Sequence, residues 1–227
     1  MANPWLEIDL DDYEGHMRAP GVEQLGVLSE LFAYALATCR PKSIAVLGIA
    51  GGNGLGAVNP SVTARVVGID INPAYLEATR RRFDTILNLE LYRLDLANQQ
   101  VELEPVDLVH AGLVLEHAGT ERCLDNALAM VARHGSLSVV LQLPSVLERE
   151  VGTSPFPAIS KLASEFSLVN PDALITQLAT RSFEPVHQST RPLPAGKAFW
   201  LGVFKRMAGT TLHSNSSSGA ELVDSSQ

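Results

Sequence analysis

Short apolar runs alternate with helical patterns along most of the chain, and this alternation restricts the fold more than any other feature of the sequence. The first run, Ser43 to Leu47, lacks the polar alternation of a half-exposed strand, as expected when both faces of a sheet are covered. Before it, apolar residues between Val22 and Cys39 recur at the three- and four-residue spacing of an amphipathic helix. Further strand-like runs are 65–69, 89–94, 106–110 and 136–143, with helices expected over 72–83 and 121–133. This order predicts an α/β fold with a parallel sheet.

The end of the chain departs from this rhythm. After a helical pattern over 172–180, two strand-like runs, Phe183 to Thr190 and Ala198 to Lys205, are separated only by Arg191 to Gly196. That connection is too short for a crossover helix, so we expect the final strand to be antiparallel.

The composition supports one main domain with additions at both ends. Of the 227 residues, 46% are hydrophobic, which allows a sizeable core. We expect a flap and helix over 1–40, a folded domain over 41–207 with a lid inserted at 144–171, and a disordered tail over 208–227, which is rich in Ser, Thr and Gly.

The charge and the apolar runs exclude several classes of protein. The formal net charge of −8 disfavours nucleic acid as the main partner. No apolar run approaches the roughly 18 residues of a membrane span, and the acidic N-terminus does not resemble a secretory signal, so we expect a cytoplasmic protein. Cys39 and Cys123 have neither disulfide nor metal-ligand spacing, so we expect free thiols and no metal site.

A glycine-rich turn, Gly48 to Gly54, directly follows the first strand. Such a turn lets backbone N–H groups approach a ligand closely, and open α/β sheets bind nucleotides at the carboxyl ends of their strands. A merely tight turn is the alternative. Because no Gly-Lys-Ser/Thr follows, the turn does not match a phosphate-binding P-loop.

Acidic residues end the next two strands. Asp70 is placed to accept hydrogen bonds from both hydroxyls of a ribose, and Asp95 follows the third strand. Asp70 alone could simply cap a helix. A glycine turn and two acids at three consecutive strand ends instead predict a pocket for an adenosine group.

The order of these features resembles the class I S-adenosylmethionine-dependent methyltransferases over roughly Ser43 to Arg206. In that family the glycine turn holds the methionine and ribose portion of the cofactor, the second-strand acid binds the ribose, and the third-strand acid contacts the adenine amino group. The segment Asp107 to His117 resembles the fourth-strand motif, which borders the methyl sulfonium. The resemblance implies S-adenosyl-L-methionine as cofactor and, as its binding residues, Gly48, Ala50, Gly52, Asn53, Gly54, Asp70, Ile71, Asp95, Leu96 and His110.

Two positions depart from the family pattern. The family usually has an acid two residues before the first glycine, where this chain has Val46, and its second glycine is here Ala50. Both concern the methionine end of the cofactor, so we expect either that the contact to its amino group comes from elsewhere or that the affinity is lower.

The resemblance implies a Rossmann-like seven-stranded sheet, mostly parallel with an antiparallel last strand and helices on both faces. It also implies in-line methyl transfer to a small-molecule acceptor. Alternatives are an NAD(P)-dependent oxidoreductase and a non-catalytic cofactor-binding scaffold, although intact Asp70 and Asp95 argue against the scaffold.

Candidate residues for the acceptor side are fewer. A neutral imidazole suits deprotonation of an acceptor hydroxyl, and His117 is our hypothesis for that base, with a structural turn histidine as the alternative. Tyr13 and His16 precede the first long helix and are candidate flap contacts to the cofactor, or part of a solvated leader. We interpret Arg80 to Arg82 as a solvated helix end.

Overall fold

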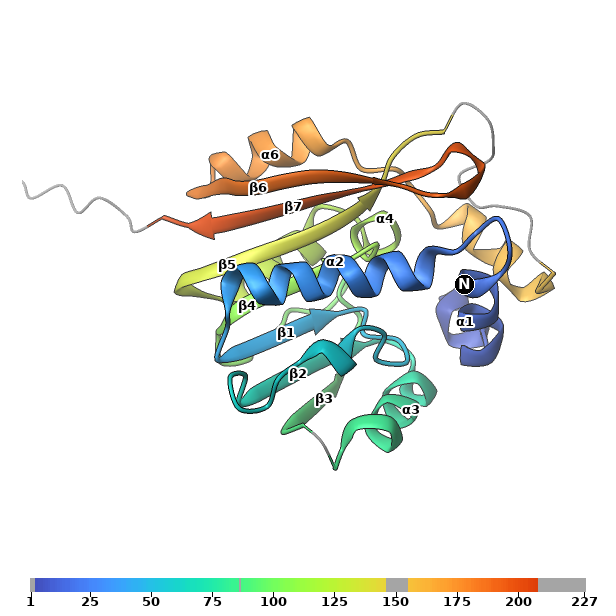
Figure 1. Cartoon of the computed structure of the whole chain (residues 1–227), viewed down its shortest axis with the longest axis horizontal. Coiled ribbons are helices and arrows are strands. Elements are labelled where there is room, and N and C mark those ends of the chain that lie inside the picture. Colours follow the sequence, from blue (N-terminus) through green and yellow to red (C-terminus); the bar gives the residue numbers. More distant parts are fainter. Residues whose placement is uncertain (1–2, 86, 146–154, 208–227) are drawn as a thin grey trace, which may run out of the picture.

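The computed structural model describes residues 3–85, 87–145 and 155–207 (Figure 1). The expected disordered tail at 208–227 lies outside the described residues, as does part of the expected lid, 146–154. Within the described ranges, no helix combines the length and the apolar character that crossing a membrane requires.

Seven strands form one sheet in the order β3-β2-β1-β4-β5-β7-β6. Strand β7 runs antiparallel to both of its neighbours, while the pairs among β1 to β5 are all parallel. The predicted fold class is therefore confirmed. The strands are β1 Ser43–Leu47, β2 Arg65–Asp70, β3 Leu89–Arg93, β4 Val106–Gly112, β5 Val131–Gln142, β6 Phe183–Pro192 and β7 Ala198–Arg206.

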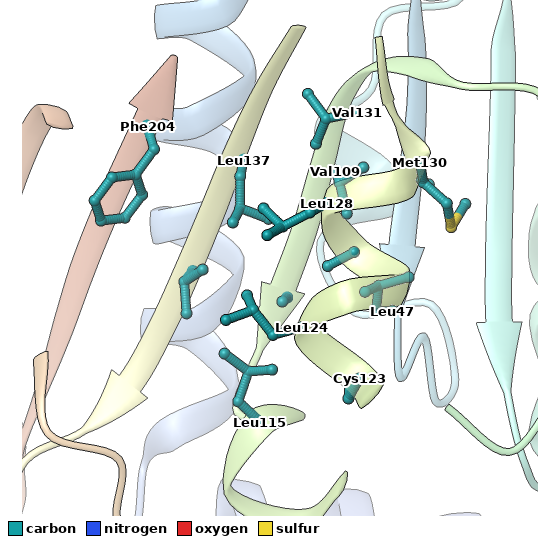
Figure 2. Packing of buried hydrophobic residues seen from close by; sticks show 14 of the residues in the cluster. Leu47, Val109, Leu115, Cys123, Leu124, Leu128, Met130, Val131, Leu137 and Phe204 are labelled. Atoms are coloured by element: carbon teal, nitrogen blue, oxygen red, sulfur yellow. The ribbon is translucent and has the colours of Figure 1, made fainter. Parts of the chain in front are cut away.

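Helices cover both faces of the sheet, which explains the unbroken apolar runs. On one face, Ile44 and Val46 pack against α2 (Gln24–Cys39) and α3 (Pro73–Phe83). The helices of the other face are α4 Leu115–Ala118, α5 Arg122–Met130 and α6 Pro171–Ala179. There, Ala45 and Leu47 belong to a cluster with residues of these helices (Figure 2).

The junction between α5 and β5 differs from the prediction. The helix expected to reach residue 133 ends at Met130, and Gly135, expected as its stop, lies inside β5. Val131 is instead fully buried and pairs with β4. The guanidinium of Arg206, from the distant β7, donates to the carbonyls of Leu128 and Val131, so a long-range contact satisfies the last carbonyls of the helix.

The segment expected as a flap is helical and partly buried, which does not fit the alternative of a solvated leader. A 3-10 turn, η1 (Pro4–Glu7), leads into α1 (Leu10–Arg18), and Glu14, His16 and Met17 are buried. The part of the expected lid at 157–164 forms a second 3-10 segment, η3 (Pro157–Ser164). Ile8 packs with Ile159 and Leu162, so the two segments share a small apolar core. Both lie at the edge of the sheet toward which β1 and β5 point (Figure 1).

Two glycines give a matched test of this packing. In Gly202→Ala, the added methyl would lie 2.7 Å from the Phe204 ring and also against Trp200, so we expect a loss of about 1–3 kcal/mol in unfolding free energy. In Gly26→Ala, on the exposed side of α2, nothing lies within 4 Å, and we expect a gain of about 0.5–1 kcal/mol. Urea denaturation measures both, and equal effects in the two variants would contradict the described packing of β7.

Candidate functional site

A cavity lies over the carboxyl ends of the parallel strands. Counted with its open mouth, the empty space of this cavity is about 1140 Å³. Its floor comes from the turns after β1, β2, β3 and β4, and α1, η1 and η3 contribute to its walls. Of the residues predicted from the sequence, Gly48, Ala50, Asp70, Ile71, Asp95, Leu96, His117, Tyr13 and His16 line it.

Two hydrogen bonds at Ala50 fix the backbone conformation of the turn after β1. This residue has a φ of 48°, a left-handed conformation that a glycine adopts without strain. Its N–H donates to Oδ2 of Asp70 at 2.9 Å, and its carbonyl accepts from the Thr79 hydroxyl at 2.7 Å. These bonds offset the cost of the conformation, which explains how alanine replaces the glycine of the family pattern.

Asp70 is the best-organised polar group of the cavity. It is only 7% exposed, and Oδ1 accepts from the N–H of Asn72 at 2.9 Å while Oδ2 accepts from Ala50. Burial raises its pKa to about 6, although the hydrogen bonds from the backbone act in the opposite direction. Each carboxylate oxygen keeps a further lone pair, so the side chain can still accept hydrogen bonds from a ligand.

Asp95 lies further along the same edge, after β3. Its Oδ1 accepts from the N–H of Ala97 at 3.0 Å and its Oδ2 from the side chain of Asn98 at 2.9 Å, the arrangement of a turn-capping aspartate. It also lines the cavity together with Leu96. Its contacts within the turn therefore leave Asp95 at the cavity, where it could still bind a ligand.

Three residues of the glycine turn that were predicted to bind the cofactor, Gly52, Asn53 and Gly54, are not among the described residues that line the cavity. The Asn53 side chain donates to the carbonyl of Leu25 at 2.9 Å, which ties the turn to α2. Gly52 and Gly54 lie against aromatic rings, where an added Cβ would come within 2.7 Å of Phe83 and 2.8 Å of Phe32, respectively. The part of the turn that borders the cavity is thus its first half, and the second half packs on the helices.

His110 also lies outside the cavity lining. Its ring is buried beside Phe32 of α2, and Nδ1 lies 3.1 Å from the Ser138 hydroxyl on β5. Burial lowers its pKa to about 4. Because alternate residues of a strand face opposite sides of the sheet, the side chain is directed to the α2 face rather than to the strand end. The direct contact predicted for His110 is therefore absent from the described cavity.

His117 lines the cavity from α4 between two aromatic rings. The ring centroids of Trp5 and Phe166 lie 4.8 Å and 5.2 Å away, both edge-on. Burial lowers its pKa to about 4, so the imidazole is neutral at physiological pH. Its buried Nδ1 has no hydrogen-bond partner within the described part of the chain.

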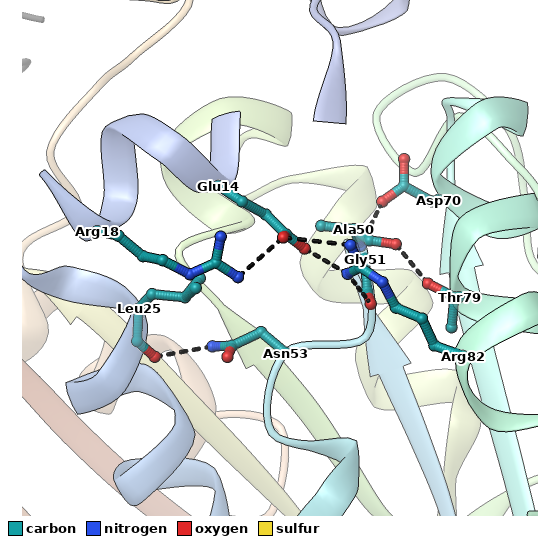
Figure 3. A network of polar contacts seen from close by, with 9 residues as sticks. All are labelled: Glu14, Arg18, Leu25, Ala50, Gly51, Asn53, Asp70, Thr79 and Arg82. Atoms are coloured by element: carbon teal, nitrogen blue, oxygen red, sulfur yellow. Dashed lines mark hydrogen bonds and ion pairs between the residues drawn. The ribbon is translucent and has the colours of Figure 1, made fainter. Parts of the chain in front are cut away.

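An ionic network joins α1 to the glycine turn (Figure 3). Arg82, at the end of α3, donates to Glu14 of α1 and, at 2.8 Å, to the carbonyl of Gly51. Arg18 donates to the same glutamate at 2.9 Å. Interpreting Arg82 as one residue of a solvated helix end was wrong, because it connects the cavity wall to its floor.

Sequence reasoning missed several lining residues. Trp5 and Asn3 come from η1 and the residue that caps it, and Asn72 donates to the carbonyl of Trp5 at 2.8 Å, fixing η1 over the end of β2. Gln24 and Lys197 come from the start of α2 and from the β6–β7 connection. No local pattern marks these residues, since tertiary contacts alone bring them to the cavity.

Comparison with known families agrees with this arrangement. Residues 44–135 match the model of a methyltransferase domain family. This range runs from β1 to within β5 and includes the turns that form the cavity floor. No curated protein sequence matches the chain.

Solved structures of similar fold cover most of the chain. The N-methyltransferase NodS from Bradyrhizobium japonicum WM9, in complex with S-adenosylhomocysteine, is 18% identical with a TM-score of 0.67, covering 90% of this chain and 97% of its own. The 1,6-didemethyltoxoflavin-N1-methyltransferase of Burkholderia thailandensis is 15% identical with a TM-score of 0.64, covering 86% and 84%. The magnesium protoporphyrin IX methyltransferase of Synechocystis PCC 6803 is 13% identical with a TM-score of 0.63, covering 91% and 98%. At these identities the likeness shows the fold.

The Glu14 network predicts a pH-dependent contribution to stability. Burial alone would raise the pKa of Glu14, but hydrogen bonds and charges from Arg82 and Arg18 outweigh it and lower the pKa. A lowered pKa means that the contribution is present at neutral pH and is lost as the pH falls through the folded-state value. We expect Glu14→Gln to cost about 1 kcal/mol at pH 7, since both arginines are partly exposed, and much less in acid.

Denaturation of both proteins across acidic and neutral pH measures this difference. Glu30→Gln, on α2 and outside the network, serves as the control. A cost of Glu14→Gln that stays constant with pH would contradict the ionic role of Glu14.

Proposed function

We propose that this chain is a class I S-adenosylmethionine-dependent methyltransferase and that it methylates a small-molecule acceptor. One observation supports the small size of the acceptor most directly: segments of the same chain, η1, α1 and η3, wall the cavity over the strand ends. Such walls favour a compact acceptor over an extended polymer. The toxoflavin-precursor and magnesium protoporphyrin methyltransferases of similar fold act on small molecules by name, which supports the same class.

The residues of the cavity floor suit the cofactor. We assign the ribose hydroxyls to Asp70, whose carboxylate is already oriented by two backbone N–H groups. The adenine is assigned to Asp95 and Leu96 with Ile71, and the methionine portion to the backbone at Gly48 and Ala50. Val46 packs in the core against α2, so the amino group is left to backbone carbonyls and other side chains of the cavity.

The cofactor supplies an electrophilic methyl group, and the chain's task is to align the acceptor with it and to exclude water. The apolar side chains around the cavity, which include Trp5, Ile159, Leu162 and Phe166, serve the exclusion of water. We propose that His117 contributes mainly as a fixed, neutral ring in this wall. A pKa of about 4 makes it a weak proton acceptor at neutral pH.

Calorimetric titration with S-adenosylhomocysteine and, separately, with NAD tests this function. We expect saturable binding of S-adenosylhomocysteine and none of NAD. Binding of NAD alone would support the oxidoreductase alternative instead. Binding of S-adenosylhomocysteine without methyl transfer to any small molecule in a broad acceptor screen would support the scaffold.

Asp70→Asn provides the residue-level prediction. The substitution keeps the shape but replaces charged hydrogen bonds to the ribose with neutral ones, so we expect a loss of about 2 kcal/mol, or roughly 30-fold in affinity for S-adenosylhomocysteine. Asp125→Asn, whose carboxylate pairs with Arg181 outside the cavity, is the matched control and should bind normally.

The same titration has a predicted pH dependence. The ligand prefers the ionised carboxylate, so the affinity of the parent protein should fall as the pH drops below about 6, where Asp70 takes up a proton in the free protein. The Asp70→Asn variant should lack this component. If the Asp70→Asn variant binds S-adenosylhomocysteine with an affinity within about threefold of the parent's, Asp70 does not belong to the binding site.

A further inference from the structure

Helix α3 holds the turn after β1 through two consecutive carbonyl groups. The Thr79 hydroxyl donates to the carbonyl of Ala50 at 2.7 Å, and the Arg82 guanidinium donates to the carbonyl of Gly51 at 2.8 Å (Figure 3). Residues three apart lie on the same face of a helix, so both side chains reach the turn from one face of α3. Ala50 lines the cavity, whereas Arg82 and Gly51 are not among the described lining residues. Arg82 can therefore act on a ligand only through the groups that it holds.

Arg82 also holds the cavity wall beside this turn. Its guanidinium donates to both carboxylate oxygens of Glu14 in α1, and the Glu14 side chain is only 6% exposed. The neighbouring residue of α1, Tyr13, lines the cavity. A side chain at Gly51 would collide with both partners of the ion pair, so the glycine leaves room for the pair directly above the turn. One guanidinium thus fixes the spacing between a floor segment and a wall segment of the cavity.

Arg82 differs in this respect from the two arginines that precede it. Arg80 lies 4.0 Å from Asp84 and Arg81 lies 3.7 Å from Glu77, and all four of these side chains are exposed. Exposed pairs one helical turn apart contribute little to stability. Arg81 therefore provides a matched control, because it carries the same charge at the adjacent position without joining α3 to another element in the described part of the chain.

We propose that Arg82 is a positioning residue for the cofactor, which keeps the turn at Ala50 and the α1 wall at the spacing that a bound cofactor requires. A ligand that needs both segments in place binds more weakly when only a fraction of the molecules has them in place. The ion pair with Glu14 raises that fraction before the ligand arrives, and it slows the separation of the two segments around a bound ligand. This inference rests on the proposed function and deepens it, since it names a residue outside the cavity that determines how tightly and how long the cofactor is bound.

The binding kinetics of S-adenosylhomocysteine on the full chain test the proposal. We expect Arg82→Gln to bind this ligand about five- to tenfold more weakly, mainly because dissociation becomes faster. Arg81→Gln removes the same charge from the exposed neighbouring position and should bind like the parent. Arg82→Lys keeps a positive charge beside Glu14 and should retain more affinity than Arg82→Gln.

A double-mutant cycle with Glu14→Gln tests whether the two side chains act as a pair. If they do, the double variant should lose about as much affinity for S-adenosylhomocysteine as Arg82→Gln alone. Losses that simply add would contradict a role exerted through the ion pair.

A general loss of stability is the alternative explanation for weaker binding. Gly202→Ala controls for it, because this variant is expected to be destabilised by crowding within β7 and not at the cavity. It should bind S-adenosylhomocysteine like the parent. Equal losses of affinity in Arg82→Gln and Gly202→Ala would show that lower stability explains both, and would contradict the positioning role.

The remaining outcomes separate this inference from the proposed function. Unchanged affinity and dissociation rate in Arg82→Gln would contradict the inference and leave the proposed function intact. If Arg82→Gln does not fold, Arg82→Lys and Glu14→Gln take its place, and parent-like binding in both would contradict the inference. A parent protein that does not bind S-adenosylhomocysteine would overturn the proposed function, and this inference with it.

Discussion

The parallel pairing of β1 with β2 on one side and with β4 on the other determines where this protein can bind a ligand. Because these strands point the same way, the turns that follow them meet at one edge of the sheet, where the chain reverses its order of strands. Gly48, Asp70 and Gly112 reach the cavity through this geometry alone. The other elements of the proposed site, η1, α1 and η3, pack over that edge.

The edge is stabilised by bonds between its own turns. Asp70 accepts hydrogen bonds from the turn after β1 and from the start of α3, so a single carboxylate fixes two ligand-facing segments. Ala50 and Leu113, both lining the cavity, have positive φ values of 48° and 56°. Strained backbone at two neighbouring strand ends is typical of sites where surrounding contacts fix a functional geometry. The Glu14–Arg82 pair then holds α1 against the first of these turns.

The sequence predicts the features that depend on local order along the chain. Strand ends, the glycine turn and the acid at Asp70 follow from short patterns, and the antiparallel last strand follows from the short connection before it. The sequence predicts less well which way a side chain points. His110 is an example, because successive residues of β4 face opposite sides of the sheet and its ring lies on the α2 side. The sequence does not predict Trp5, Gln24 or Lys197, because folding brings them to the cavity from separate segments with no periodic pattern of their own.

Different polar side chains line different parts of the cavity. The acidic side chains of Asp70 and Asp95 line the cavity after β2 and β3, whereas His16, Gln24 and Lys197 line it from α1, α2 and the β6–β7 connection. The central claim is that the cofactor binds in this cavity with its adenosine at Asp70 and Asp95. A crystal structure of the full chain with S-adenosylhomocysteine would test this claim most directly. The account predicts ribose hydroxyls on the Asp70 carboxylate and adenine beside Asp95 and Leu96. A ligand bound with its adenosine over β5 and Lys197, or outside the cavity, would contradict it.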